Sequence, residues 1–578
     1  MHHKKILLIA PYNHYATGLR QLAAVLHAQG YQAVILAFKK HLTTSRKGIS
    51  ATEWELLHSY ITAYKPDCIG VSLTSIRLLD EKRFLGALKA AAPNAVIMCG
   101  GFGPTFESAR YLHDGADYVV RGEGEGAILD IAEALHTGAD MRSIRNIAYL
   151  KDGELVQNPL RPLIKDLDSL PYYLHGDEHF ACIENNELTL HDPVFTAEKM
   201  YLVNTSRGCV GHCTYCSGGN WLNIYRQEYG CARRYRARKV EAVLKELEQA
   251  KTKGAAFILF YDEYFVRSPE DFHFFFTQYR QRIDLPYFLM VHTGFLAKDE
   301  QRFQDFFASG VRTVQIGVQS ASKRVSVEIF KRNMEPGHQL QAIQKFHAYR
   351  IATLVDFITA HALEEEQDYR DTLDFIKELP FDPTWPERTA IQVFPLGLFP
   401  GAPIADLYPL LRESPVPDKV MRHKVFMAYL RYIIKDDTLF ESLYADPWFR
   451  EHPQELLLIY RREFYAALHD VLRHAALRLA GREVWYWGCG EVYHTHKHLF
   501  RLCKPRGMLL NIPTDLTDVD GLAIRHPNEA LQDRDSTPIV IFGADAGILS
   551  NRILRDYPEY TNIVTVTGGG PYMPLFLA

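Results

Sequence analysis

The chain has 578 residues, a formal net charge of −4 and an isoelectric point near 6.7. Such a balance gives no field that would favour nucleic acid or an anionic membrane surface, and no apolar run approaches the roughly 18 residues of a membrane span. The chain has only nine cysteines, and residues 1–5 lead straight into an apolar strand. We therefore expect a soluble, cytoplasmic protein of several domains that does not bind nucleic acid.

Residues 1–145 alternate apolar strands with helices. The expected strands are Lys4–Ala10, Ala33–Ala37, Cys68–Leu73, Ala95–Met98 and Tyr118–Val120. This order predicts a doubly wound, Rossmann-like parallel sheet, which binds ligands at the carboxyl ends of its strands. The candidate binding residues at those ends are Asn13, Ser72, Thr74, Gly100 and Gly101.

Residues 146–198 contain several prolines and predict a connector, and a tight group of cysteines follows it. Cys209, Cys213 and Cys216 are spaced C-x-x-x-C-x-x-C. Thiolates suit iron–sulfur clusters, zinc or copper(I), and a 4Fe-4S cluster held entirely by protein takes four cysteines. Three ligands would leave one iron open to chemistry. A structural zinc completed by His212 or Cys231 is less favoured, because a second C-x-x-C pair is missing.

Residues 199–410 again alternate helices and strands, which predicts a partial (β/α) barrel. The expected strands are Ala256–Tyr261, Tyr287–His292, Thr313–Gln319, Thr353–Thr359 and Ala390–Phe394. Asp262 and Glu263 directly follow the first of these strands, and Ser320 follows the third. Such barrels keep their catalytic groups at the carboxyl ends of the strands. Asp262 and Glu263 are therefore candidates for the active site.

The last part of the chain carries a weaker signal. Residues 411–480 predict helices rich in Tyr, Phe and Arg, which could cover the barrel mouth. Residues 481–578 predict a small Rossmann-like α/β module, with Gly488 and Gly490 after its first strand. A lone G-x-G is weak support for a nucleotide site. We favour a docking or substrate-holding role for this module.

The cysteine spacing, with the helix and strand that follow it, resembles the radical S-adenosylmethionine (SAM) enzymes. The resemblance implies a 4Fe-4S cluster on Cys209, Cys213 and Cys216, with SAM chelating the open iron and being cleaved to a 5′-deoxyadenosyl radical. It also implies SAM contacts for several residues. Those residues are Tyr215 near the adenine, Asp262 or Glu263 at the amino group, and Ser320 at the ribose or methionine part.

Two positions depart from the pattern of that family. Gln319 stands where an acid is usual, so a charged contact to SAM becomes a neutral one. His361 and Ala362 stand where a glycine–proline turn is usual, which leaves the local substrate contacts open.

The N-terminal segments P-D-C-I-G-V-S-L-T-S, V-I-M-C-G-G-F-G-P-T and A-D-Y-V-V-R-G-E-G-E resemble the cobalamin-binding domain of the cobalamin-dependent radical SAM enzymes. The resemblance implies that Gly100 and Gly101 admit the nucleotide tail of cobalamin, since glycine has no Cβ to clash. It implies hydrogen bonds to that tail from Ser72 and Thr74. A loop of Gly122, Glu123, Gly124 and Glu125 would face the barrel.

The cobalt-ligating motif D-x-H-x-x-G is not reproduced near the end of the first strand. The chain has Tyr12 to Gly18 there, without the Asp and with the glycine one place late. We favour His14 as a loop histidine near the corrin, or as a surface histidine, over His14 as a cobalt ligand.

The resemblance implies a cobalamin-dependent radical SAM enzyme, for which we expect C-methyl transfer to an unactivated carbon of a small molecule, through a deoxyadenosyl radical and methylcobalamin. A reductant such as flavodoxin or ferredoxin is the expected protein partner. Two alternatives stay open: a cyclase, oxidase or rearrangement enzyme without methyl transfer, and a catalytically inactive cobalamin-binding protein. A methylthiotransferase is disfavoured, because the N-terminal domain of such an enzyme needs three cluster cysteines. The N-terminal domain of this chain has only Cys68 and Cys99.

Overall fold

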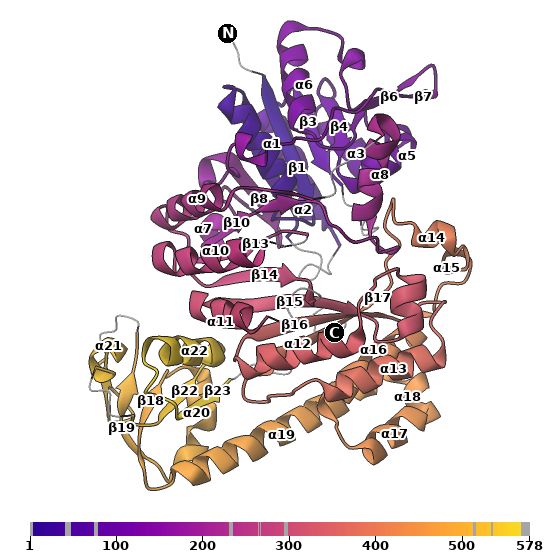
Figure 1. Ribbon diagram of the computed structural model, residues 1–578. Helices are drawn as coiled ribbons and strands as arrows, with labels where there is room; N and C mark the ends of the chain where they lie inside the picture. Colours follow the sequence, from indigo (N-terminus) through magenta and orange to yellow (C-terminus); the bar gives the residue numbers. More distant parts are fainter. Residues whose placement is uncertain are drawn as a thin grey trace.

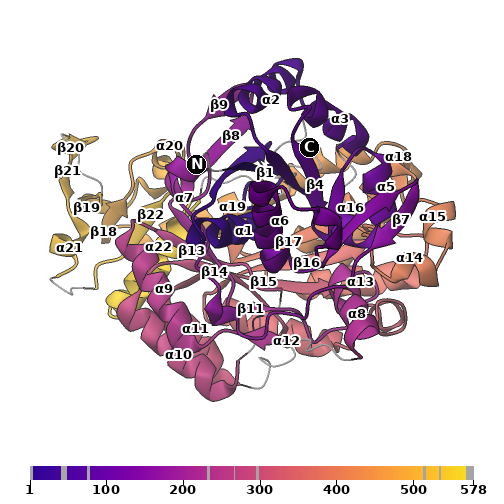
Figure 2. The same ribbon diagram turned by 90° about the horizontal axis from the view of Figure 1, so that it is seen from above.

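The computed structural model describes residues 4–40, 48–73, 79–230, 235–263, 265, 267–293, 299–511, 516–532 and 536–567. Three α/β bodies follow one another along the chain (Figure 1), and each is built on a largely parallel sheet. Viewed from above, the first body lies over the second, and the third body projects to one side (Figure 2). The described residues include no helix that is long and apolar enough to cross a bilayer.

The first body is a nine-stranded sheet in the order β7-β6-β5-β4-β3-β1-β2-β8-β9. Its strands are β1 (Lys5–Pro11), β2 (Gln32–Phe38), β3 (Cys68–Ser72), β4 (Val96–Gly100), β5 (Tyr118–Val120), β6 (Ile147–Lys151), β7 (Glu154–Gln157), β8 (Phe180–Glu184) and β9 (Glu187–Thr189). The order of β1 to β5 is that of a doubly wound fold, as predicted. The segment expected as a connector therefore also extends this sheet at both edges.

Helices cover both faces of the first sheet. The helices are α1 (Thr17–Ala28), α2 (Ala51–Tyr64), α3 (Glu81–Ala91), α4 (Phe102–Phe106), α5 (Ser108–His113) and α6 (Glu125–Thr137). One apolar core includes residues of α1 and α6, and the other includes residues of α2 and α3. The strands between them are almost continuously buried, which explains their uninterrupted apolar sequences.

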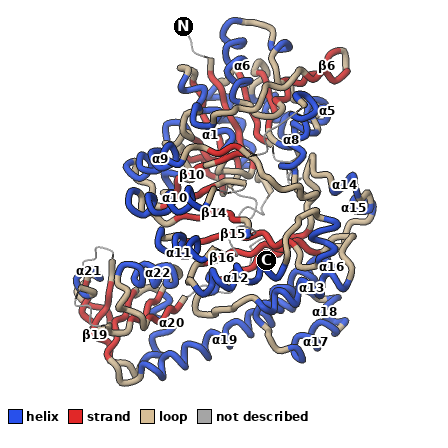
Figure 3. Tube along the Cα trace, viewed as in Figure 1, coloured by secondary structure: helices blue, strands red, loops and turns tan. Residues whose placement is uncertain are grey.

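The second body is an open barrel of six parallel strands in the order β10-β13-β14-β15-β16-β17. The strands are β10 (Met200–Val203), β13 (Phe257–Phe260), β14 (Tyr287–Val291), β15 (Val311–Gln319), β16 (Ala352–Thr359) and β17 (Thr389–Pro395). The helices of the barrel are α8 (Ser217–Tyr229), α9 (Val240–Thr252), α10 (Pro269–Arg282), α11 (Glu300–Ser309), α12 (Pro336–Ala348) and α13 (Glu366–Glu378). Figure 3 shows the helices on the outside of the strands.

Long helices join the barrel to the third body (Figures 1 and 3). Helix α16 (Asp418–Ile433) packs against β17 and α13, and α19 (Leu456–Leu479) packs against α16. These helices thus lie in the outer layer of the barrel. Their apolar side chains continue the core under the barrel helices rather than covering the barrel mouth.

The third body has the strand order of a Rossmann fold, β21-β19-β18-β22-β23, with β20 added at one edge. The strands are β18 (Glu483–Trp487), β19 (Lys504–Leu509), β20 (Asp518–Val519), β21 (Leu522–Arg525), β22 (Ile539–Phe542) and β23 (Ile563–Val566), followed or preceded by α20 (Glu491–His496) and α22 (Ala546–Asp556). This order agrees with the predicted module.

The third body docks on the amino-terminal side of the barrel. Arg312, at the start of β15, donates to Asp545 at 2.9 Å, just after β22. Arg350, just before β16, donates to Ser550 at 2.6 Å. The carboxyl end of the module's sheet therefore faces the barrel base, away from the end where the cysteines lie. The docking or substrate-holding role of this module stays a prediction.

Candidate active site

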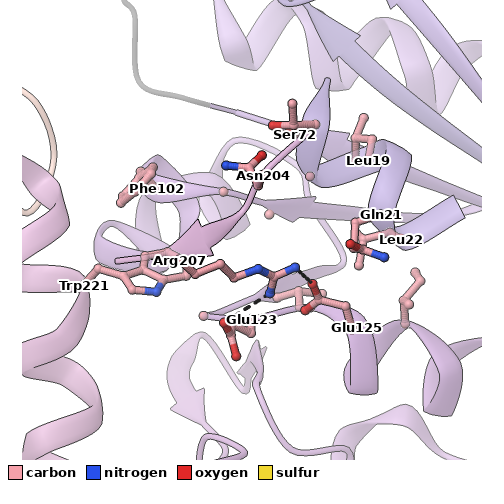
Figure 4. A pocket seen from close by; sticks show the side chains of 18 of the residues that line it. Leu19, Gln21, Leu22, Ser72, Phe102, Glu123, Glu125, Asn204, Arg207 and Trp221 are labelled. Carbon is pink, nitrogen blue, oxygen red and sulfur yellow. Dashed lines mark hydrogen bonds and ion pairs between the residues drawn. The ribbon is translucent and has the colours of Figure 1, made fainter. Parts of the chain in front are cut away.

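A cavity of about 330 Å³ lies between the first sheet and the barrel (Figure 4). From the first body it is lined by Leu8, Leu19, Leu22, Ser72, Gly100, Gly101, Phe102, Gly122, Glu123 and Glu125, and from the barrel by Asn204, Arg207, Gly208, Gly218, Trp221, Arg236 and Glu263. Five of the predicted cobalamin-binding residues are in this lining, together with Glu263 from the predicted SAM site. The two groups of residues therefore border one space.

On the side of the first body, glycine backbone forms part of the cavity wall. We call this part of the cavity the glycine slot. A Cβ on Gly70 would lie 2.8 Å from Leu8 Cδ2, and a Cβ on Gly101 would lie 2.6 Å from the Leu73 carbonyl oxygen. Gly101 also has φ 105°, which side-chain-bearing residues rarely adopt. Apolar side chains such as Met98 and Ile128 form the rest of this wall. A lining of glycine backbone and apolar side chains fits the nucleotide tail of cobalamin.

Two residues that were predicted to bind cobalamin, Thr74 and Asn13, are not among the lining residues above. Thr74 lies outside the described residues. Asn13 accepts a hydrogen bond from the backbone N–H of Ala16 at 3.2 Å, which stabilises the turn before α1. It is not among the lining residues of the described cavity.

His14 lies in the same turn and also points elsewhere. Its side chain is buried, its Nε2 lies 3.7 Å from a carboxylate oxygen of Glu198, and its ring lies 4.4 Å from that of Tyr15. His14 is likewise absent from the lining of the described cavity. His14 is therefore buried rather than at the surface, and a place near the corrin or on the cobalt stays a prediction.

The loop after β5 is held against the barrel by ion pairs. Glu123 accepts from Arg207 at 3.1 Å, and Arg207 also donates to Glu125 at 2.6 Å (Figure 4). Glu123 also accepts from Arg236 at 2.7 Å. Burial alone would raise the pKa of Glu123, but the hydrogen bond from Arg236 and the charges of both arginines lower it. Tyr225 receives a hydrogen bond from the Glu123 backbone N–H at 2.7 Å. We call Glu123, Glu125, Arg207 and Arg236 the charge clamp.

Neither arginine of the charge clamp was predicted from the sequence. They come together because two short strands, β11 (Ser206–Arg207) and β12 (Arg236–Ala237), pair antiparallel with Arg207 opposite Arg236. A two-residue pairing across almost thirty positions leaves no periodic signal in the sequence. The arginine-rich run around Arg236 was the available hint.

The three cysteines lie on the loop between β11 and α8, and each thiol sulfur has an N–H donor. Cys209 accepts from the Gly211 backbone at 3.3 Å, Cys216 accepts from the Gly218 backbone at 3.4 Å, and Cys213 lies 3.9 Å from Arg332 Nη1. Such donors favour thiolates, the form that binds metal. Burial raises the pKa of Cys216 to about 11, so cluster binding must displace its proton.

The arrangement of the three thiols helps to decide between a structural zinc ion and an iron–sulfur cluster. Among the described residues, no three His, Cys, Asp or Glu side chains converge on a position for a metal ion. A structural zinc requires four such ligands around one point, whereas the cysteines of a cluster bind different iron atoms. Three separate thiols, each with an N–H donor, fit the cluster better than a single zinc ion.

The two acids after β13 have different surroundings. Asp262 is buried and accepts hydrogen bonds from Thr205 N at 2.9 Å and from Ser206 Oγ at 2.6 Å. It therefore ties the end of β13 to the end of β10. Glu263 borders the cavity, and a Cβ built on Gly218 would lie 3.7 Å from its Oε2 and 3.5 Å from Cys216 Sγ. Glu263 is thus the acid that faces the cysteine loop.

The other predicted SAM contacts lie around the same loop. The ring of Tyr215 lies 4.8 Å from that of Phe330, and its hydroxyl accepts a hydrogen bond from Arg332 at 3.2 Å. Ser320 is buried after β15, where its Oγ accepts from Ser322 N at 3.2 Å. Neither residue lines the described cavity. Their SAM contacts remain predictions.

Arg332 is a further residue of the site that was not predicted from the sequence. Besides its contacts with Cys213 and Tyr215, it donates to the Gly317 carbonyl oxygen at 2.6 Å. It therefore joins the cysteine loop to β15. His361, at one of the positions that depart from the family pattern, is buried at 5% exposure, with its ring 5.5 Å from that of Phe330.

Comparison with known proteins places both halves of this site in known families. Residues 4–132 match the B12 binding domain model, and residues 203–376 match the Radical SAM superfamily model. The uncharacterized methyltransferase PH0819 of Pyrococcus horikoshii is 24% identical over 370 residues, which cover 63% of this chain and 73% of that protein. The anaerobic magnesium-protoporphyrin IX monomethyl ester cyclase of Rubrivivax gelatinosus is 27% identical over 361 residues, 60% of each chain.

Solved structures share the fold. The radical SAM methyltransferase TsrM from Kitasatospora setae, with cobalamin and a [4Fe-4S] cluster bound, superposes with a TM-score of 0.53 at 17% identity, over 70% of this chain and 77% of that one. The cobalamin-dependent SAM radical enzyme OxsB, with aqua-cobalamin bound, gives a TM-score of 0.53 at 14% identity, over 83% of this chain and 76% of that one.

The residues present and the two family models agree on the cofactors. These are a 4Fe-4S cluster, SAM and cobalamin, and the chain is an enzyme. With a B12-binding domain, a radical SAM barrel and one cavity between them, this chain belongs to the cobalamin-dependent radical SAM enzymes.

Proposed function

We propose that this enzyme transfers a methyl group from cobalamin to an unactivated carbon of a small-molecule substrate. The observation that carries the proposal is the shared cavity, whose lining joins the glycine slot of the first body to Gly218 and Glu263 beside the cysteine loop. Hydrogen abstraction and methyl transfer at one carbon require both cofactors to reach the same point. Methyltransferases among the relatives support this choice.

The residues divide the work between the two halves of the cavity. Cys209, Cys213 and Cys216 would hold the cluster, and Glu263 would bind the amino group of SAM, with Tyr215 and Ser320 as further SAM contacts. Ser72, Gly100 and Gly101 would hold the cobalamin tail. When bound, the cluster with SAM supplies a hydrogen-abstracting radical, and cobalamin supplies the methyl group.

We infer that side chains between the two halves of the cavity limit the access of water to it. The rings of Phe102 and Trp221 lie 4.9 Å apart at the wall between the slot and the cysteine loop. The charge clamp fixes the loop after β5 against the barrel. A reactive carbon radical needs such protection from side reactions.

Methyl transfer can be tested directly with SAM that carries a trideuterated methyl group. The enzyme, with cluster and cobalamin loaded, is incubated with reductant and fractionated metabolites, and products are analysed by mass spectrometry. We expect a product that has gained the trideuteromethyl group. Loss of hydrogen or ring closure without label would contradict methyl transfer.

A product that has lost hydrogen or closed a ring without gaining the label would indicate the alternative function, a cobalamin-dependent cyclase or oxidase. It is favoured by the cyclases among the relatives, one of which is 27% identical over 361 residues. An inactive cobalamin-binding protein would give neither product, and its SAM cleavage would be no greater than that of a Cys213→Ala variant.

A further inference from the structure

Helix α8 begins at the third cysteine of the cysteine loop and is bound to the barrel there. Cys216 is the N-cap residue of the helix. Ser217 Oγ donates a hydrogen bond to the Pro400 carbonyl oxygen at 2.7 Å, and Asn220 Nδ2 donates to the Gly401 carbonyl oxygen. Both acceptors lie in the loop after β17. The position of Cys216 therefore depends on how α8 is held.

The remaining turns of α8 are bound to the first body through one helical face. Residues three and four positions apart share a face of a helix. That face carries Trp221, Tyr225, Glu228 and Tyr229. The Trp221 ring lies 4.9 Å from that of Phe102. Glu228 Oε1 accepts from Leu160 N at 3.1 Å, and the Tyr229 hydroxyl accepts from Arg145 Nη2 at 2.8 Å. Helix α8 is therefore held by the barrel at its start and by the first body along its later turns.

Tyr225 makes the most buried of these contacts. The residue is 1% exposed, and its hydroxyl accepts from the backbone N–H of Glu123 at 2.7 Å. A Cβ added to Gly122 would overlap this hydroxyl, and Gly122 has φ 75°, so the close approach requires glycine. Gly122 and Glu123 both border the cavity. Tyr225 thus binds α8 to the first-body loop that forms part of the cavity wall.

The same loop of the first body also binds the chain on the other side of the cysteines. Arg207, two residues before Cys209, donates to Glu123 in the charge clamp. Cys216, the last of the three cysteines, caps the helix that Tyr225 binds to Glu123. The loop after β5 therefore holds the cysteine loop from both ends.

A helix transmits this position over a fixed distance. Cys216 and Tyr225 are nine residues apart, which is about 13 Å along a helix axis. A helix cannot change that length without breaking its backbone hydrogen bonds. Hydrogen abstraction depends on placement to within about 1 Å, so the cluster with its SAM and the cobalamin need a constant separation.

We propose that α8 sets the separation between the cluster and cobalamin, and that Tyr225 is the positioning residue that holds it. Tyr225 is not among the lining residues of the described cavity, so it acts through Glu123 and through the helix. This inference rests on the two cofactors and on no particular reaction, because a cyclase that uses both would need the same constant separation.

Pulsed electron paramagnetic resonance (EPR) spectroscopy on the full chain with cluster and cobalamin tests the proposal. The sample is poised at a potential at which the reduced cluster and the Co(II) of cobalamin both carry an unpaired electron, and their dipolar coupling reports the distance between them. We expect a single narrow distance distribution in the wild type. In Tyr225→Phe, which keeps the ring, displaced positions of α8 should gain about fivefold in population, because a typical hydrogen bond is lost. The distribution should broaden accordingly.

Tyr465→Phe is the matched control, because Tyr465 is 43% exposed on α19, and it should reproduce the wild-type distribution. A double variant, Tyr225→Phe with Tyr229→Phe, loses a second hydroxyl contact with the first body and should broaden the distribution further. An unchanged distribution in Tyr225→Phe overturns the proposal, and a double variant as narrow as the wild type also contradicts it. The thermal midpoint is measured on the same samples. A lower midpoint at an unchanged distance would show that Tyr225 has a purely structural role.

The distance measurement separates this inference from the proposed function, because it needs no substrate. Absorption bands of the cluster and of cobalamin confirm that each variant carries both cofactors. Failure of the distance test in a chain loaded with both cofactors counts against Tyr225 and α8 alone. Failure of label transfer counts against the methyltransferase assignment.

Discussion

At the residue scale, sequence neighbours in this enzyme have different tasks. Asp262 and Glu263 are adjacent acids, yet Asp262 bonds to Thr205 and Ser206 while Glu263 borders the cavity. Gly100 and Gly101 are adjacent as well. Gly101 is required by its positive φ, whereas a Cβ on Gly100 would have ordinary contact, 3.7 Å from Val120 O. Of the two, only Gly101 has a backbone conformation that requires glycine.

This difference predicts how a large side chain at position 100 would change the affinity for cobalamin. Gly100→Leu should fold, because its backbone conformation suits any residue, but its side chain would occupy the space for the cobalamin tail. We expect cobalamin affinity to fall at least tenfold, measured by equilibrium dialysis, with the cluster absorption unchanged. Gly86→Leu, on an exposed turn of α3 where an added Cβ would have no atom within 4 Å, is the matched control. Normal cobalamin binding by Gly100→Leu would refute the slot.

The cysteine loop makes a second prediction at this scale. Cys213→Ala should abolish the cluster absorption band and EPR signal after anaerobic reconstitution, and with them reductive SAM cleavage, because three thiolates are the minimum set here. Cys489→Ala, in the third body, should retain both. A cluster of normal intensity in Cys213→Ala would show that another ligand serves.

At the element scale, the pairing of β11 with β12 couples the two halves of the cavity. It aligns Arg207 with Arg236, and both bind Glu123 at the end of the first sheet. The side chains of Glu123 and Arg236 are only 10% and 5% exposed. The pair is therefore little screened by solvent, unlike most surface ion pairs.

Arg236→Met should accordingly lower stability by about 1–3 kcal/mol, the cost of leaving a buried charged group short of a partner. The measurement is the shift in thermal midpoint, and a double-mutant cycle with Glu123→Gln should recover most of the loss. Arg282→Met is the control, because Arg282 pairs with the exposed Glu241 and Glu248 on the barrel surface. Equal losses in the two arginine variants would argue against a special role for the charge clamp.

At the scale of the whole molecule, buried charges hold the segment that leads into the barrel against the first body. Arg20 on α1 donates to both oxygens of Asp192, at 2.7 and 2.8 Å, and lies 3.0 Å from His175 Nδ1. Burial alone would raise the pKa of Asp192, but the hydrogen bonds from Arg20 and His175 hold it well below its usual value. Burial lowers the pKa of His175 to about 4.

Both shifts destabilise the protein in acid. The unfolded His175 takes up a proton below about pH 6.5 while the folded one resists until about pH 4, so stability should fall through this window by about 3 kcal/mol. Asp192, with its lowered pKa, adds a further loss below about pH 4. Thermal midpoints measured from pH 8 to 4 should show the decline, and His175→Phe should flatten it above pH 4. A decline of equal size in that variant would assign it to other groups.

Local patterns in the sequence were enough to predict the α/β fold class and the family, because both depend on apolar periodicity, turn glycines or a fixed cysteine spacing. The role of the three cysteines as cluster ligands stays a prediction. Tertiary packing determined which of the two acids faces the cavity, how Arg207, Arg236 and Arg332 reach it, and where the third body docks. It also brought Gln315 to Asp356 across two strands. These outcomes depend on strand register and packing between segments far apart in the chain, for which short-range patterns carry no signal.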